Sequence, residues 1–415
     1  MFVLALATGL PYDRPLVAES VEYRAIAISG LASIHKPYSE RFLNPTVAAL
    51  VARAGGIDID RAFVIVAISA LAILLICIAT LLDRTTAHPE LIVPLVFVPP
   101  LLKMVGLYYI QDLFYAAILS VFLVLLARER IVLAALAMLA LYMTRESALI
   151  LCLAVIVVGW MWSRRDLIWI AIAVIVLGTV ATGYAGSLGL PNTHQMNEFA
   201  FVTLKIPFDA IRDFFGIILM PNTLRSHPGN DCVAIATVNL PKLIQAGDLR
   251  SFDVCRAPIT VPLWTYSNLL AGFGVMPMVA GFILWRRGRE IVSTAPSWLL
   301  VTLIYGGVTF VTAPMVGTWM DRMVGYGWPL FWIAVPALAA TLYRPGRSAT
   351  TLILSYSCVL AWIPWILQRF TYYGVAPMLI VIVIAIVAYA ATLPALRRID
   401  SYAEPNRETS AAANG

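Results

Sequence analysis

Charged residues are scarce in this sequence. They make up 13% of its 415 residues, whereas soluble domains carry roughly 25%. Hydrophobic residues make up 61%, and the mean hydropathy is +0.85. This composition excludes an ordinary soluble domain and predicts a polytopic membrane protein. The apolar runs are continuous and do not alternate with a period of two, so we expect them to form helices, whose backbone groups are satisfied internally in lipid.

Histidine and cysteine are also few, with four and five residues respectively. No Cys-x-x-Cys or His/Cys cluster is present, so nothing indicates a zinc site, and we expect neither a metal nor a cofactor. The net charge of +6 is typical of a membrane protein with basic cytoplasmic loops, and we do not interpret it as nucleic-acid binding. Cys232 and Cys255 both lie in a long polar region. They either form a disulfide in an oxidising compartment or remain two separate buried thiols.

The apolar runs predict an all-α polytopic membrane protein with about 11–12 transmembrane helices, since each span needs roughly 20 apolar residues. The first run, 2–11, is too short for a full span, and we expect a short or truncated first helix. A long first external loop, 12–61, carrying juxtamembrane helices follows it. Further spans are expected at 62–82, 91–110, 113–127, 168–184, 263–285, 298–316, 328–343, 351–367 and 377–396.

These spans divide the chain into four regions. We predict an N-terminal transmembrane catalytic module at 1–184 and a large extracytoplasmic loop, the fourth external loop, at 185–262. C-terminal transmembrane helices follow at 263–398, and the polar residues 399–415 are expected to form a disordered cytoplasmic tail.

The run 131–161 has Arg145 and Glu146 at its centre. Interpreted as two short helices that meet at these residues, it places all the arginine-rich loops on one side of the membrane, which predicts that this side is cytoplasmic. The first loop, Asp112, the joint and the region 185–262 then lie on the extracytoplasmic side. Two helices this short do not cross a core of ~30 Å comfortably, so we expect the joint to lie below the outer surface and to line a cavity.

Candidate chemistry concentrates in the first loop. Glu19 and Tyr23 are four residues apart and share a face if this segment is helical. A carboxylate at the membrane edge can act as a general base on a hydroxyl, and Asp13, which directly follows the first apolar run, competes with Glu19 for that role. Glu22 and Glu40 are weaker candidates. The segment 35–45 contains Lys36 and Arg41, and the planar guanidinium of Arg41 suits a phosphate.

Charged residues also occur inside or beside the predicted spans. Because charge is expensive in a membrane, such residues are candidates for function. They are Lys103, Asp112, Arg145, Glu146, Asp321 and Arg322. A basic residue at lipid head-group depth suits a departing phosphate, while a snorkelling lysine or a local ion pair is the alternative interpretation.

The layout resembles the GT-C superfamily of integral-membrane glycosyltransferases. Glu19-Ser-Val-Glu22-Tyr23 is similar to the Asp-Glu-x-x-Tyr segment of that family, and residues 38–45 are similar to its aromatic/Arg-x-Leu-x-Pro stretch. Asp112 opens the fourth helix, Thr144-Arg145-Glu146 looks like the family's Thr-Arg-Glu, and 321–329 looks like its acidic-Arg segment. The family's loop carboxylate is usually an Asp near the end of the first helix, which is the place of Asp13 here.

The resemblance implies a sugar donor of the polyprenyl-phosphate type, inversion at the anomeric carbon and a bilayer location, with the catalytic loops outside a bacterial cytoplasmic membrane. The acceptor would be a cell-envelope glycan, a lipid or a protein. Glu19 or Asp13 would be the base, and Lys103, Arg145, Arg322 and Arg41 would bind the donor phosphate. A polysaccharide polymerase or lipid-linked-glycan ligase is one alternative, and a non-enzymatic transporter is another.

Overall fold

The computed structural model describes residues 18–85, 97–190, 198–221, 252–315, 320–343, 347–371 and 374–403. The predicted all-α polytopic fold class is confirmed. Among these residues, five helices are long and apolar enough to cross a membrane, or six if one bent pair counts as a single span. Four shorter apolar helices accompany them. The first apolar run, the residues that follow it up to position 17, and residues 86–96 lie outside the described residues.

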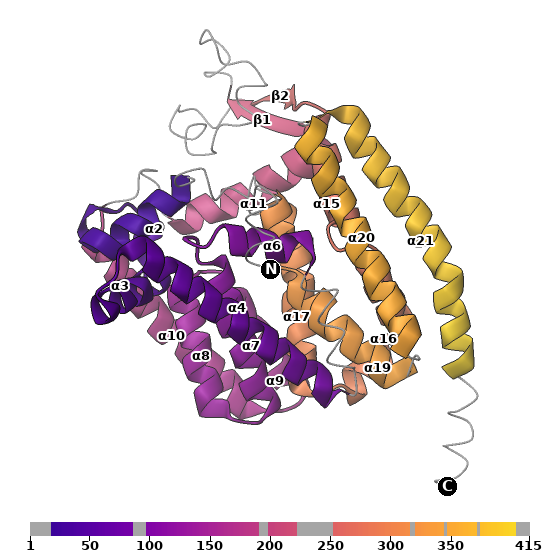
Figure 1. Cartoon of the computed structure of the whole chain (residues 1–415), viewed down its shortest axis with the longest axis horizontal. Helices are drawn as coiled ribbons and strands as arrows, with labels where there is room; N and C mark the ends of the chain where they lie inside the picture. Colours follow the sequence, from indigo (N-terminus) through magenta and orange to yellow (C-terminus); the bar gives the residue numbers. More distant parts are fainter. Residues whose placement is uncertain are drawn as a thin grey trace.

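The helices of the first half pack beside one another in one part of the molecule, and those of the second half form the other part (Figure 1). The first group is α4 (Ile59–Arg84), α6 (Pro99–Gly106), α7 (Asp112–Ala127), α8 (Ile131–Thr144), α9 (Ala148–Met161) and α10 (Arg165–Leu188). The second group is α15 (Thr260–Ala271), α16 (Met276–Thr294), α17 (Ser297–Thr312), α18 (Met320–Gly325), α19 (Val335–Tyr343), α20 (Arg347–Thr371) and α21 (Val375–Ala403). Helix α17 contacts α7 and α9 and so joins the two groups.

The first loop is helical where it is described, as predicted. It consists of α2 (Ala18–Ser29), two short 3-10 turns and α3 (Leu43–Gly55). Gly56 ends α3 in the left-handed conformation, with φ at 60°, which glycine adopts without a steric penalty. Asp58 then caps α4 by accepting a hydrogen bond from the backbone of Arg61 at 2.9 Å. These signals explain why a turn separates two helices here.

The split of 131–161 is confirmed, because α8 ends at Thr144 and α9 begins at Ala148. The predicted span at 263–285 is not a single continuous helix. It is divided between α15 and α16, whose axes are bent by 66°. The break contains Gly274, whose φ is 59°, and a Cβ at this position would clash with the backbone of Ser357. The bend therefore depends on contact with α20, which the local hydropathy pattern does not reveal.

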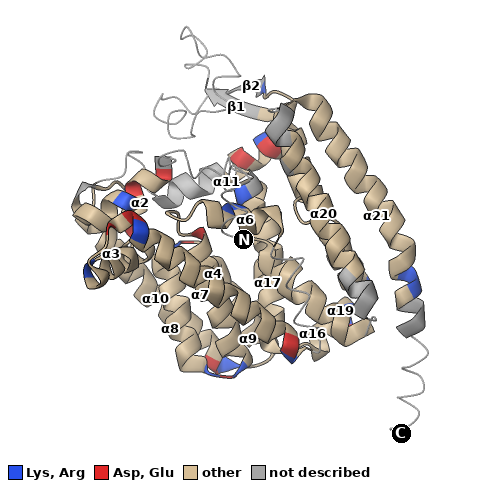
Figure 2. Cartoon of the chain, in the orientation of Figure 1, with Lys and Arg blue, Asp and Glu red and all other residues tan. Residues whose placement is uncertain are grey.

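Contacts join several of the basic loops that were predicted to lie on one side, while residues 344–346 of one of these loops lie outside the described residues. Arg164 binds Glu129 at 2.9 Å, Arg84 donates to the carbonyl of Ala127, and the guanidinium of Arg287 lies 5.8 Å from the ring centre of Tyr343. In Figure 2 the ribbon is coloured for charged residues at this end and around α2, α3 and α11 (Glu198–Phe215) at the opposite end, with mostly uncharged helix between.

Two short strands are the exception to the helical fold. β1 (Ile217–Pro221) and β2 (Phe252–Arg256) pair antiparallel, with Ile217 opposite Arg256. They follow α11 and precede α15 at the end of the molecule that carries the first loop (Figure 1). At the other end α21 continues to Ala403, past the predicted boundary at 398, and residues 404–415 lie outside the described residues.

One late span is enclosed by the others. Residues 322–343 comprise most of α18, a π-helical segment at Leu330–Ala334 and α19, and 89% of this apolar stretch is buried inside the protein. The corresponding share is 22% for α10 and for α21, whose remaining apolar surface suits contact with lipid. Arg322 at the start of the enclosed span is therefore placed in the interior.

Candidate functional site

The candidate site is a cluster of charges where the first turns of α7 and α18 meet the joint between α8 and α9. At its centre is Asp112, the first residue of α7, which is only 1% exposed. Arg322 binds it with two nitrogens: Nη2 donates to Oδ1 at 3.0 Å and Nε donates to Oδ2. This planar, bidentate contact is the strongest common form of a carboxylate–guanidinium pair.

Two further donors converge on the same carboxylate. Arg145 donates from Nη1 to Asp112 Oδ1 at 2.9 Å, and the hydroxyl of Tyr326 donates to the same oxygen. The guanidinium of Arg145 also lies 4.4 Å from the centre of the Tyr326 ring, within cation–π distance. Asp112 is therefore fully engaged, as a buried charge must be if it is to persist in an apolar interior.

Glu19 extends the cluster towards the first loop. Its Oε2 accepts a hydrogen bond from Nη1 of Arg322 at 2.7 Å. The side chain of Arg322 is 3% exposed, but that of Glu19 is 29% exposed. Arg322 thus joins a sealed carboxylate on α7 to a partly accessible one on α2. Of the two, only Glu19 has surface that a substrate could reach in this arrangement.

A second ion pair holds the first loop on the joint. Arg41 donates from Nε to Glu146 Oε2 at 2.8 Å and from Nη1 to the hydroxyl of Tyr23 at 3.4 Å. The surrounding protein would raise the pKa of Glu146, although 64% of its side chain is exposed, but the charges of Arg41 and Arg145 outweigh this effect and lower the pKa to about 2. Burial raises the pKa of Tyr23, which is 0% exposed, although Arg41 partly opposes this effect. At neutral pH, Arg41 and Glu146 are therefore charged and Tyr23 is neutral.

These contacts balance three guanidinium groups against three carboxylates. The guanidinium groups are those of Arg41, Arg145 and Arg322, and the carboxylates are those of Glu19, Asp112 and Glu146. The cluster is consequently neutral as it stands. An anionic ligand would have to compete with a carboxylate for a guanidinium, and Glu19 and Glu146 are the accessible carboxylates, with Glu146 64% exposed.

Comparison with protein-family models, curated proteins and solved structures gives no match to this chain. The site is therefore interpreted from its own geometry.

The structure brings most of the predicted site residues together. Arg145 and Arg322 share Asp112, and Arg41, Glu146, Glu19 and Tyr23 adjoin them. Lys103 is on α6, which packs against α18, and its predicted convergence with the two arginines remains a prediction. Glu22 is half-buried on α2.

Other predicted residues lie elsewhere or cannot be placed. Lys36 and Glu40 bind each other at 3.3 Å, and both lie against Gly186 of α10. Asp13 and Cys232 are outside the described residues, and the side chains of Asp321 and Cys255 are not described. The predicted disulfide therefore stays a prediction.

The spacing of Asp58 and Asp60 is Asp-x-Asp, which can mark a metal site, but both are engaged in structural contacts. Asp58 caps α4, while Asp60 accepts hydrogen bonds from Arg24 at 2.7 Å and from the hydroxyl of Tyr109 at 3.0 Å. Within the described ranges, no group of three or more His, Cys, Asp and Glu side chains is arranged to hold a metal ion.

The main residue that sequence reasoning missed is Tyr326, which contacts both Asp112 and Arg145. Its signal was available, because it stands between Gly325 and Gly327 just after the charged pair 321–322. Tyr115 and Tyr305 were also missed. Their hydroxyls are 3.0 Å apart in the interior, and the ring of Tyr115 lies edge-on to Tyr326 at 6.3 Å.

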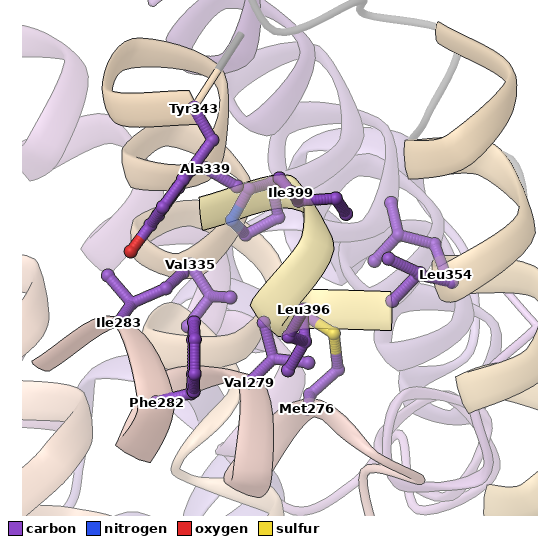
Figure 3. A pocket seen from close by; sticks show the side chains of 12 residues that line it. Met276, Val279, Phe282, Ile283, Val335, Ala339, Tyr343, Leu354, Leu396 and Ile399 are labelled. Atoms are coloured by element: carbon purple, nitrogen blue, oxygen red, sulfur yellow. The ribbon is translucent and has the colours of Figure 1, made fainter. Parts of the chain in front are cut away.

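A cavity of about 50 Å³ lies in a different part of the molecule, between α16, α19, α20 and α21 (Figure 3). Its lining carries no charged side chain and includes Met276, Phe282 and Leu396. An apolar lining of this kind supplies neither a base nor an anion-binding group, so the charged cluster around Asp112 is the candidate site.

Proposed function

We propose that this chain is a membrane glycosyltransferase of the GT-C type, which transfers a sugar from a polyprenyl-phosphate donor with inversion. The observation that carries the proposal is the contact of Arg322 with Glu19 of the first loop and with Asp112 of α7. It puts a partly accessible carboxylate beside guanidinium groups, which are the two elements that transfer from a lipid phosphate requires.

Glu19 is the general base of the proposed reaction. Its carboxylate takes the proton of an acceptor hydroxyl, and the hydroxyl oxygen forms a bond to the anomeric carbon of the donor sugar. The bond from that carbon to the phosphate oxygen breaks on the opposite face, and its electron pair leaves with the lipid phosphate. The sugar passes through an oxocarbenium-like state, as in glycoside hydrolysis.

The arginines would stabilise the negative charge that develops on the leaving phosphate. Arg322 would serve this role once the bound donor replaces its contact with Glu19, because the phosphate leaves from the face of the sugar opposite the base. Arg145 and Arg41 would support it from the joint, and Lys103 from α6. Asp112 is saturated by its donors and 1% exposed, so its role is to orient Arg322 and Arg145 and not to accept the acceptor proton.

The location follows from the same proposal. The chain would lie in a bacterial cytoplasmic membrane, with the candidate site on the extracytoplasmic side, opposite the arginine-rich loops. A lipid-borne sugar would reach the site from the outer leaflet, and the acceptor would be a glycan, lipid or protein of the cell envelope.

The decisive experiment compares carboxylate variants of the first loop. The full chain, reconstituted in lipid nanodiscs, is given a panel of polyprenyl-phosphate sugars and a cell-envelope glycan fraction, and release of polyprenyl phosphate is measured. A general base contributes roughly 10²–10⁴-fold, so we expect Glu19→Gln to lose at least ~100-fold in turnover with donor binding retained. Glu40→Gln is the matched control, because Glu40 is paired with Lys36 beside α10, and it should keep near-normal turnover.

Asp13→Asn is measured alongside, since Asp13 is the alternative base. A large loss in this variant with normal turnover in Glu19→Gln would transfer the role to Asp13. If both variants turned over normally, the first loop would not supply the base, and a polysaccharide polymerase or lipid-linked-glycan ligase would explain the chain better.

A further inference from the structure

Gln111 carries a buried amide that the charged cluster does not use. Its side chain is 0% exposed, and neither Nε2 nor Oε1 has a hydrogen-bond partner among the described residues. The backbone of the same residue is engaged, because its carbonyl accepts from the amide of Tyr115 at 2.7 Å. Buried polar side chains are nearly always paired, so an uncommitted amide at this position requires an explanation.

Gln111 lies at the wall of the candidate site. It immediately precedes Asp112 and stands four residues before Tyr115, so it shares the Tyr115 face of α7. That face meets Tyr305, whose hydroxyl is 3.0 Å from that of Tyr115, and Tyr326. Ile110, the residue before Gln111, packs in one cluster with Tyr23 and Ile26 of α2. Gln111 is thus next in the chain both to Asp112, which binds the two arginines, and to Ile110, which packs on the helix that carries Glu19.

Asn268 shows what a structural amide looks like in the same protein. It is 4% exposed, and its Nδ2 donates to the carbonyl of Trp264 at 2.8 Å within its own helix. Gln111 has no such contact among the described residues. An apolar residue of the same length would occupy the position at lower free-energy cost, so packing alone does not account for glutamine.

We propose that the side-chain amide of Gln111 recognises a hydroxyl of the sugar that the lipid phosphate carries. This inference rests on the proposed function and makes it more specific. A carboxamide offers one acceptor and two donors, and a sugar hydroxyl both donates and accepts, so the two groups can pair in both directions. A phosphate has no donor to offer at neutral pH and is matched instead by the guanidinium groups. Because Gln111 is 0% exposed, binding of the sugar requires side chains at this end of the site to move, while Glu19 stays at the anomeric carbon and the phosphate is held at the arginines.

The test separates recognition of the sugar from recognition of the lipid phosphate. Dissociation constants are measured for the full chain in nanodiscs with polyprenyl phosphate alone and with polyprenyl-phosphate hexoses and pentoses. Gln111→Met keeps the unbranched shape and removes the amide, and Gln111→Leu is the second variant in case the first does not fold. We expect binding of polyprenyl phosphate to be unchanged and binding of the preferred sugar-bearing lipid to weaken on the order of tenfold, the value of about one hydrogen bond.

Thermal stability gives an independent readout. Because the substitution removes no hydrogen bond to a described residue, the melting temperature of Gln111→Met should not fall, whereas Asn268→Leu should lower it without any selective effect on sugar-bearing ligands. Equal weakening for both kinds of ligand, or a fall in melting temperature with unchanged sugar preference, would show that Gln111 is structural. If the wild-type chain bound no sugar-bearing lipid more tightly than polyprenyl phosphate, the proposed function and this inference would both fail. A wild-type preference that survives the substitution would overturn this inference alone.

Discussion

The ion pair between Asp112 and Arg322 should stabilise the fold strongly, and a double-mutant cycle can measure by how much. Asp112→Asn keeps the size of the side chain and removes its charge. Arg322→Gln removes the charge of the partner and leaves a shorter, polar side chain. Both side chains are almost sealed, at 1% and 3% exposed. Each single variant therefore leaves a buried charge with a partner missing.

Breaking a buried ion pair typically costs about 3–5 kcal/mol. After Asp112→Asn, Arg322 keeps its contact with Glu19 at 2.7 Å, and Arg145 keeps its contact with the ring of Tyr326. We therefore expect the free energy of unfolding to fall by ~3 kcal/mol, the lower end of that range. In the double variant neither Asp112 nor Arg322 remains as an unpaired charge. Arg145 loses Asp112 in both the single and the double variant, and Glu19 loses Arg322 in the other single and the double variant, so these losses cancel in the cycle. The double variant should therefore lose less than the sum of the singles by as much as ~3 kcal/mol, the upper end of such coupling energies.

The free energy of unfolding is measured in mixed detergent micelles with a rising fraction of denaturing detergent, followed by tryptophan fluorescence. The control cycle uses Glu129 and Arg164, which are 2.9 Å apart at the other end of the molecule with side chains 59% and 34% exposed. An exposed pair is worth only about 0.2–1 kcal/mol. If the Asp112 cycle gave a coupling no larger than the control, the cluster would not be desolvated, and the reasoning from burial would be wrong.

Two further predictions follow from single positions. Gly274→Ala should destabilise the protein severely, because the φ of 59° at Gly274 and the backbone of Ser357 exclude a Cβ. Gly281 has open space around it, so Gly281→Ala should leave the free energy of unfolding unchanged or raise it by up to ~1 kcal/mol. Equal unfolding midpoints for the two variants would refute the account of the bend. The pKa of Glu146 is lowered from 4.5 to about 2, so its pairing with Arg41 should contribute stability above about pH 4.5 that is lost as the pH falls towards 2. Glu146→Gln should be less stable than wild type at neutral pH and lack this acid-dependent loss, and an unchanged acid profile in the variant would contradict the assignment.

Much of the architecture could be predicted from local patterns. The low charge content and the continuous apolar runs predicted helices in a membrane, and the charged joint at 145–146 predicted that 131–161 divides into two helices. The arginine-rich loops were predicted to lie together, and the contact between Arg164 and Glu129 joins two of them. Hydropathy and charge act on each segment separately, because the transfer of a segment into lipid depends on its own side chains.

Only the tertiary structure decided which charges meet. Asp112 and Arg322 are separated by 210 positions, and no pattern along the chain indicates that α7 and α18 place them in contact. The sequence suggested the arginines as partners of a phosphate, but in the folded chain carboxylates already occupy them. Local hydropathy likewise predicted one span at 263–285 and gave no sign that α15 and α16 are bent by 66°. Charge pairing and bends depend on what packs against a helix, and helices distant in sequence supply those neighbours.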